Sequence, residues 1–222
     1  MSKQSWKPGN MLYPLPVVMV SCNRKGEKPN IVTVAWTGTI CSDPAMVSIS
    51  VRPERYSHDI IEETGEFVIN LVTKDLTYAT DYCGVRSGRD VDKFKEMNLT
   101  PLPSKMIDAV GIEESPVNIE CKVVEVKKLG SHDMFIAEVV NVTVDDRYMD
   151  ENNKFNLNDS DLVAYSHGEY FTLGEKITVK KIGSMFLAIV GCILASGFLE
   201  SSIGSISLIG VLGGVGAAIF CA

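Results

Sequence analysis

The stretch "TVAWTGTICSDP" (residues 33–44) begins with the alternation of a β-strand and ends in an Asp-Pro pair typical of a turn. Between these two signals lie Trp36, Thr37, Gly38 and Thr39, where a simple buried strand would have valine or isoleucine. An aromatic side chain next to small hydroxyl groups is an unusual way for a strand to end. The stretch predicts a strand that stops near Trp36. The role of the polar residues that follow has to be inferred from the rest of the chain.

The residues on either side of this stretch predict a mainly antiparallel β protein. In residues 117–126 apolar and charged side chains alternate with a period of two, which places one face in a core and the other in water. Further strands are predicted at residues 17–22, 31–35, 46–51, 67–71, 117–128, 134–144 and 162–165. Short helices are predicted at residues 57–64, with Ser57 as N-cap, at 74–82 and at 91–97. Many short strands and few helices indicate a barrel or sandwich.

Composition narrows the class of protein. A chain of 222 residues with 45% hydrophobic content is long enough for one soluble domain with a real core. The net charge of −7, without a cluster of basic residues, argues against a nucleic-acid-binding protein. The six cysteines form no CxxC pair and no signal peptide precedes them, so we expect reduced thiols in a cytoplasmic domain.

The composition changes near residue 181. Residues 182–222 contain one charged residue, Glu200, and eight of the eighteen glycines. The runs 182–199 and 203–222 each approach the length of a membrane-spanning helix, and basic residues precede them. A domain at residues 1–181 is therefore expected, followed by an apolar tail. That tail is either a transmembrane hairpin, a buried or disordered hydrophobic end, or a segment unrelated to the domain's function.

Familiar reactive motifs are missing from the sequence. No GxGxxG follows a strand in residues 1–181, no GxSxG elbow occurs, and the three histidines have no cysteine or carboxylate at zinc-ligand spacing. A side-chain nucleophile and a metal site are both disfavoured. The sequence therefore points to a bound cofactor as the reactive group.

Three stretches together predict a site for a phosphorylated cofactor. The first is the opening stretch; the second, "SISVRPERYSHD", contains Ser50, Arg52, Arg55 and Ser57; the third is "DYCGVRSGRDVDKF". Arg55 and Ser57 lie at a predicted helix start, where free N–H groups favour an anion and an arginine adds bidentate donors. Each stretch alone also fits a core strand or a plain surface loop.

In order and spacing, residues 33–73, "DYCGVRSGRDVDKF" (81–94) and "SHGEYFTLGEK" (166–176) resemble the flavin reductase-like family, and within it the flavoredoxin branch. The resemblance covers about residues 8 to 176. It implies an FMN-binding split β-barrel of the Greek-key antiparallel type. It also implies a homodimer with flavin near the subunit interface, and electron transfer through the flavin from NADH or NADPH.

The resemblance also implies roles for individual residues. Asn30, Trp36, Thr37 and Thr39 would hold the isoalloxazine ring and ribityl chain. The phosphate would be bound by Arg55 and Ser57, with Ser50 and Arg52 beside them. Three further residues match positions around the flavin ring: Lys93, His132 and Tyr165.

The expected function is an FMN-dependent oxidoreductase whose electrons leave to free flavin or to a redox protein. One alternative is an electron carrier that binds FMN without enzymatic turnover. The other is a membrane-tethered barrel that binds no flavin.

Overall fold

The structure is a computed structural model that describes residues 1–174, 187 and 190. The chain divides into two compact units, Met1–Leu173 and Gly174–Ala222, and the first contains all the strands and sites below. The predicted boundary at residue 181 and the predicted membrane hairpin lie outside the described residues. No helix in the described part of the chain is long and apolar enough to cross a membrane.

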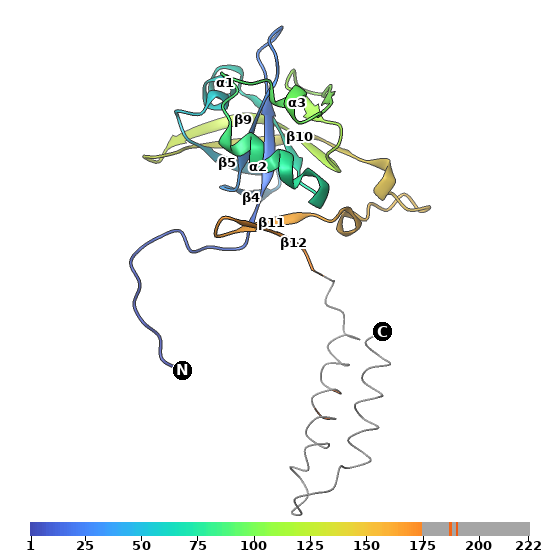
Figure 1. The fold of residues 1–222 in the computed structure, drawn as a ribbon. Coiled ribbons are helices and arrows are strands. Elements are labelled where there is room, and N and C mark those ends of the chain that lie inside the picture. The colour runs from blue at the N-terminus through green and yellow to red at the C-terminus, as the bar shows by residue number, and fades with distance from the viewer. Residues whose placement is uncertain (175–186, 188–189, 191–222) are drawn as a thin grey trace, which may run out of the picture. The chain divides into compact units, whose positions relative to one another are not determined.

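A seven-stranded antiparallel sheet forms the body of the first unit (Figure 1). Its spatial order is β3-β2-β6-β9-β10-β5-β4. The strands are β2 (Val18–Cys22), β3 (Asn30–Val34), β4 (Thr37–Ser42), β5 (Ala45–Val51), β6 (Glu66–Leu71), β9 (Val117–Lys128) and β10 (Asp133–Val144). All seven predicted strands are present, the seventh being β11 of a second sheet, and the predicted antiparallel pairing is confirmed.

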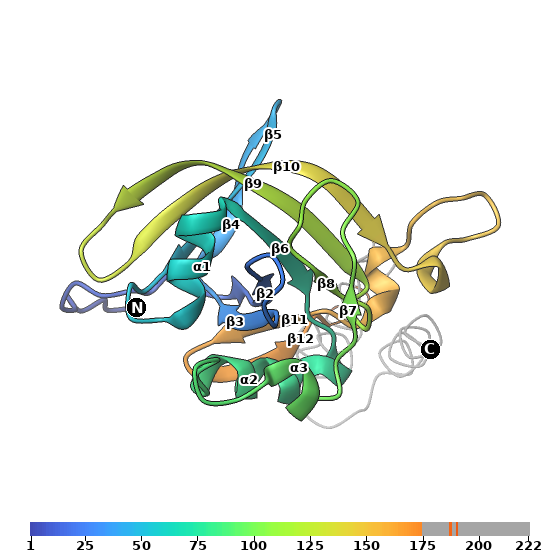
Figure 2. The ribbon, with the colours of Figure 1, turned by 90° about the horizontal axis from the view of Figure 1, so that it is seen from above.

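The opening stretch joins the two edges of this sheet. β3 is one edge strand and β4 is the other, yet only Ala35 and Trp36 separate them in the chain. Two residues can connect opposite edges only if the sheet curls on itself, and Figure 2 shows this curl, with β9 and β10 as a long arc. The backbone N–H of Ser50 donates to the Trp36 carbonyl at 2.8 Å and ties the junction to β5. The predicted end of a strand near Trp36 is present, since β3 ends at Val34, but the second strand that begins at Thr37 was not predicted.

Two hydrophobic layers hold the curled sheet. The interior is filled by alternate residues of the strands and by one face of α1 (Tyr56–Thr64), with Phe67 and Phe135 fully buried. The outer face of β2 and β3 packs against α2 (Thr77–Val85) and α3 (Lys93–Glu96), where Met19 and Ile31 are buried. All five residues of β2 are buried because both faces of that strand are covered.

Smaller elements complete the unit. A three-stranded sheet contains β1 (Leu15–Pro16), β11 (Val163–Ser166) and β12 (Glu169–Thr172), and a two-stranded sheet contains β7 (Pro101–Leu102) and β8 (Gly111–Ile112). The 3₁₀ turns are Lys74–Leu76, Asp146–Tyr148 and Leu157–Ser160. The predicted helix at 74–82 is therefore a 3₁₀ turn that leads directly into α2.

The start of α1 differs from its prediction. Arg55 is the N-cap residue, in extended conformation, and it makes no side-chain cap hydrogen bond. Ser57 lies inside the first turn and is buried; its Oγ accepts a hydrogen bond from Asn30 Nδ2 at 2.7 Å. Ser57 therefore links the helix to β3 instead of capping it.

Candidate functional site

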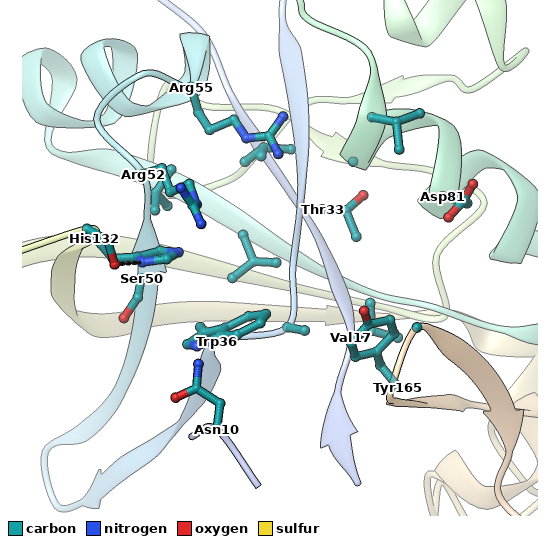
Figure 3. Close-up of a pocket in the computed structure, with 18 of the residues that line it drawn as sticks. Asn10, Val17, Thr33, Trp36, Ser50, Arg52, Arg55, Asp81, His132 and Tyr165 are labelled. Carbon is teal, nitrogen blue, oxygen red and sulfur yellow. Dashed lines mark hydrogen bonds between the residues drawn. The ribbon is translucent and has the colours of Figure 1, made fainter. Parts of the chain in front are cut away.

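A cleft of about 670 Å³ lies where the two sheet edges meet. Its walls come from β3 and the Ala35–Trp36 junction, from the end of β5, from the turn between β9 and β10, and from the β11–β12 hairpin. Six of the predicted residues line it: Trp36, Ser50, Arg52, Arg55, His132 and Tyr165. Figure 3 shows them around one space, with Arg52 and Arg55 on one side and Tyr165 on the other.

An aromatic pair forms one wall of the cleft. Trp36 is 42% exposed, and its ring lies nearly parallel to His132, with centroids 5.9 Å apart and an interplanar angle of 14°. His132 Nδ1 and Ser131 Oγ are hydrogen-bonded at 2.9 Å, which fixes the imidazole orientation. Burial and the nearby charge of Arg52 lower the pKa of His132, so its neutral form is favoured. The wall offers a flat apolar face beside a neutral imidazole.

The opposite wall carries two phenols and a carboxylate. Tyr165 and Tyr170 meet edge to face, with centroids 5.7 Å apart. Tyr170 donates a hydrogen bond to Asp81 Oδ1 on α2 at 3.2 Å, which ties the β11–β12 hairpin to that helix. Burial and Asp81 raise the pKa of Tyr170 to about 12, so its hydroxyl stays protonated at neutral pH.

A smaller pocket of about 130 Å³ adjoins the cleft, because Val32 and Arg55 line both. We call it the cationic pocket. Three cationic side chains line it against one carboxylate: Arg55, Arg86 and Lys93 against Glu54. Asn30, Ser57, Ser87 and Gly88 add small polar groups. Asn30, Ser57 and Lys93, which lie far apart in sequence, meet here. The resemblance gave Asn30 and Lys93 roles at the flavin ring and ribityl chain, but neither lines the cleft that contains Trp36, His132 and Tyr165.

Lys93 is the buried cation of this pocket. Its side chain comes from the first residue of α3, and the residue is only 3% exposed. The ammonium donates to the carbonyl oxygens of Ile31 at 2.5 Å and Cys83 at 2.8 Å. Burial lowers the pKa of Lys93 to about 8, and the charge of Arg55 acts in the same direction. Two of its three N–H groups are engaged, so one is left for a ligand.

Arg55 and the first turn of α1 add to the positive potential of the pocket. The helix has no side-chain cap, so backbone N–H groups of its first turn remain as donors. Within the described residues, the Arg55 guanidinium makes no ion pair or side-chain hydrogen bond. A helix N-terminus combined with an unpaired arginine and a buried lysine favours a phosphate-sized anion.

Two predicted residues lie outside both cavities. Thr37 donates its hydroxyl to the Ser48 carbonyl at 2.8 Å, so this group is engaged in the β4–β5 ladder. Thr39 is exposed on edge strand β4. The structure therefore brings nine of the eleven predicted residues to the two cavities and leaves these two threonines on the adjoining strand.

Some lining residues were missed by the sequence interpretation. Asp81, Arg86 and Tyr170 contribute polar groups, and Asn10 reaches the cleft from the N-terminal segment. Asp81 and Arg86 belong to the quoted stretch 81–94, so their proximity to Arg89 and Lys93 was an available signal. Tyr170 belongs to the quoted stretch 166–176, but nothing in that stretch indicated contact with Asp81, because the contact depends on the β11–β12 hairpin.

Comparisons with known proteins agree on one family. The family model of the flavin reductase like domain matches residues 10–174. An uncharacterized protein of Archaeoglobus fulgidus is 32% identical over 161 residues, covering 72% of this chain and 89% of that protein. The structure of flavoredoxin from Desulfovibrio vulgaris (Miyazaki F) is similar, with 31% identity and a TM-score of 0.74 over 80% of this chain and 96% of that chain. A flavoredoxin from Methanosarcina acetivorans gives 26% identity and a TM-score of 0.71, covering 80% and 95%.

These matches confirm the resemblance drawn from the sequence and the split-barrel fold that it implied. The chain belongs to the family of flavin reductase like domains.

Proposed function

We propose that this chain binds FMN and passes electrons from NADH or NADPH through it to free flavin or to a redox protein. The observation that carries the proposal is the joining of an aromatic cleft to a cationic pocket through Arg55. FMN has the same two parts, a flat ring and a phosphate. Family membership and the flavoredoxin relatives support a flavin as the ligand.

The cationic pocket fits the phosphate end of FMN. Lys93 is a buried ammonium with two carbonyl acceptors and a third N–H free to donate. Arg55 has no competing partner among the described residues, and Ser57 lies in the uncapped first turn of α1. Hydrogen bonds between charged groups are shorter and stronger than neutral ones, so these donors would supply most of the phosphate affinity.

The cleft fits the isoalloxazine ring of FMN. Trp36 would stack on the isoalloxazine and exclude water from one face, with Tyr165 at the opposite wall. When bound, the flavin would accept a hydride and release electrons to the acceptor. Arg52 and the His132 imidazole line the same space, where their N–H groups would stabilise negative charge on the reduced ring.

We also propose that the chain acts as a homodimer. Large apolar side chains are exposed at the cleft (Trp36 and Leu129), on edge strand β4 (Ile40) and on the β9–β10 hairpin (Val124 and Val142). Since Trp36 and Leu129 also line the cleft, a second copy covering this region would complete the walls of the site. Light scattering of the purified protein should give the mass of a dimer, and a monomer at micromolar concentration contradicts this part of the proposal.

The test of function begins with absorbance. The purified protein should show flavin absorbance or acquire it on mixing with FMN, and should then oxidise NADH or NADPH in steady state. A flavin-loaded protein without turnover, with both nucleotides and added free flavin, would favour the electron-carrier alternative. A protein that neither contains nor takes up flavin would contradict both and favour the barrel that binds no flavin.

Arg55→Ala tests the phosphate end separately. We expect FMN binding to weaken by about 1.5 to 3 kcal/mol, the range for hydrogen bonds to charged groups. Riboflavin, which has no phosphate, should bind the variant and the wild type alike. Arg24→Ala is the matched control, because Arg24 is paired with Glu63 and lines none of the described cavities. An unchanged FMN dissociation constant in Arg55→Ala would remove Arg55 from the site.

A further inference from the structure

A third cavity, of about 290 Å³, lies next to the cationic pocket. We call it the outer cavity. Asn30, Tyr56 and Gly88 line both cavities, so the two cavities are neighbours that share a wall at these residues. A Cβ at Gly88 would overlap the Asn30 side-chain amide, so the absence of a side chain at this position keeps the shared wall thin. The outer cavity therefore lies directly beside the place where the cationic pocket would hold a phosphate.

A fixed guanidinium lies at the edge of the outer cavity. Arg89 donates through Nη1 to the Glu54 carbonyl at 3.1 Å and through Nη2 to Asp59 Oδ2 at 3.3 Å. Its guanidinium lies over the Tyr56 ring, 5.2 Å from the ring centroid. Its side chain is still 48% exposed, so the outer face of the guanidinium is available. Nucleic-acid bases stack on such arginine planes and on aromatic rings.

Carboxylates line the same cavity. Asp92 is held as the N-cap of α3, where it accepts from the Lys95 N–H at 3.2 Å, and it lies 3.6 Å from the Lys28 ammonium. Asp90, in contrast, has no ion pair within the described residues. A carboxylate beside a nucleotide site characteristically accepts hydrogen bonds from ribose hydroxyls. A stacking plane and a free carboxylate, on the far side of a phosphate pocket, are what a nucleoside requires.

We propose that the outer cavity is a binding subsite for a purine nucleoside. The base would stack on Arg89, and the ribose hydroxyls would bind Asp90. Two sources supply this chemistry: the adenosine half of FAD, whose pyrophosphate would occupy the cationic pocket, or the adenosine end of the nicotinamide nucleotide, bound beside the FMN phosphate. The inference rests on the proposed flavin function and extends it to the nucleoside that the site selects.

Calorimetric titration of the full chain tests the proposal, with FMN, with FAD, and with ADP-ribose added to FMN-loaded protein. Arg89→Ala and Asp90→Asn are the variants. Arg147→Ala is the matched control, because Arg147 also lies over a tyrosine ring, at 5.7 Å from Tyr148, and pairs with Asp145 away from these cavities. Thermal melting shows whether each variant is folded.

If FAD is the source, wild type binds FAD at least as tightly as FMN, and Arg89→Ala weakens FAD binding by about fivefold or more, with FMN changed less than twofold. If the nicotinamide nucleotide is the source, ADP-ribose binds FMN-loaded wild type, and Arg89→Ala weakens it by the same factor. Asp90→Asn should weaken the same ligand.

The nucleoside subsite would be overturned if Arg89→Ala changed the affinities for FMN, FAD and ADP-ribose equally. The same loss of affinity in Arg147→Ala would also overturn it. The subsite would also be overturned if wild type bound FMN in a way that depends on Arg55 but bound neither FAD nor ADP-ribose. If no flavin binds wild type at all, the proposed function itself fails, and this result is distinct from the others.

Discussion

Lys93 makes the affinity of the cationic pocket for phosphate depend on pH. Burial lowers the pKa of Lys93 to about 8, so roughly 90% of the free protein carries its ammonium at pH 7 and roughly 10% at pH 9. A bound phosphate would raise this pKa, because it favours the charged form. The FMN phosphate is doubly ionised over this whole range, since its second pKa lies near 6.

FMN affinity should fall as the pH rises, because phosphate binding is linked to protonation of Lys93. Binding takes up a proton on Lys93 only where the free protein has lost it, so affinity is constant below the pKa and falls above it. Above this pKa, each further pH unit lowers the FMN affinity by up to a factor of ten. We therefore expect the FMN dissociation constant to rise about tenfold between pH 7 and pH 9. Riboflavin, which lacks the phosphate, should not show this rise.

Fluorescence titration of FMN at several pH values measures this effect. Lys93→Arg keeps a cation that does not titrate in this range, so its pH profile should be flat. Lys93→Met should be flat as well, with FMN binding weakened at pH 7 by about 1.5 to 3 kcal/mol. A wild-type dissociation constant that is equal at pH 7 and pH 9, or a riboflavin profile as steep as that of FMN, would refute the reasoning.

Two other substitutions test the remaining walls. Trp36→Ala should weaken riboflavin binding by about 1 to 3 kcal/mol, the range for a base stacked on an aromatic ring, with little change in melting temperature because Trp36 is 42% exposed; unchanged riboflavin affinity would contradict a stacking role. Gly88→Ala should lower the free energy of unfolding by about 1 to 3 kcal/mol through overlap with Asn30, whereas Gly38→Ala, with open space around it, should not. Equal urea midpoints for these two variants would contradict the crowding at Gly88.

The sequence predicted local structure well and distant contacts poorly. The seven predicted strands are present because alternation and β-branched residues report burial on one face of a strand. The strand Thr37–Ser42 was missed, since it is an edge strand without a buried residue and gives no hydrophobic alternation. The N-cap was misassigned to Ser57 because the buried hydrogen bond from Asn30 is a tertiary contact.

The candidate site, like the fold, was predicted from the sequence in its residue types but not in its contacts between distant residues. Residue types in three separate stretches, together with the family resemblance, predicted a site for a phosphorylated cofactor at Trp36, Arg55 and Lys93. The positions of Thr37 and Thr39 could not be read from the stretch, because the β4–β5 register decides which way they face. Likewise, Tyr170 and Asp81 meet only because the hairpin after β11 folds back towards α2.

The amino-acid sequence by itself determined the strand pattern, the family and the kinds of side chain available for binding. The tertiary structure alone decided that "TVAWTG" bridges the two edges of one curled sheet, which brings Val32 and Trp36 to the same space as Ser50 and Arg52. It also decided that Lys93 is buried against the Ile31 carbonyl, which sets its pKa. The physical reason is that pairing order and burial depend on contacts between distant residues, whereas periodicity reports only each strand's own two faces.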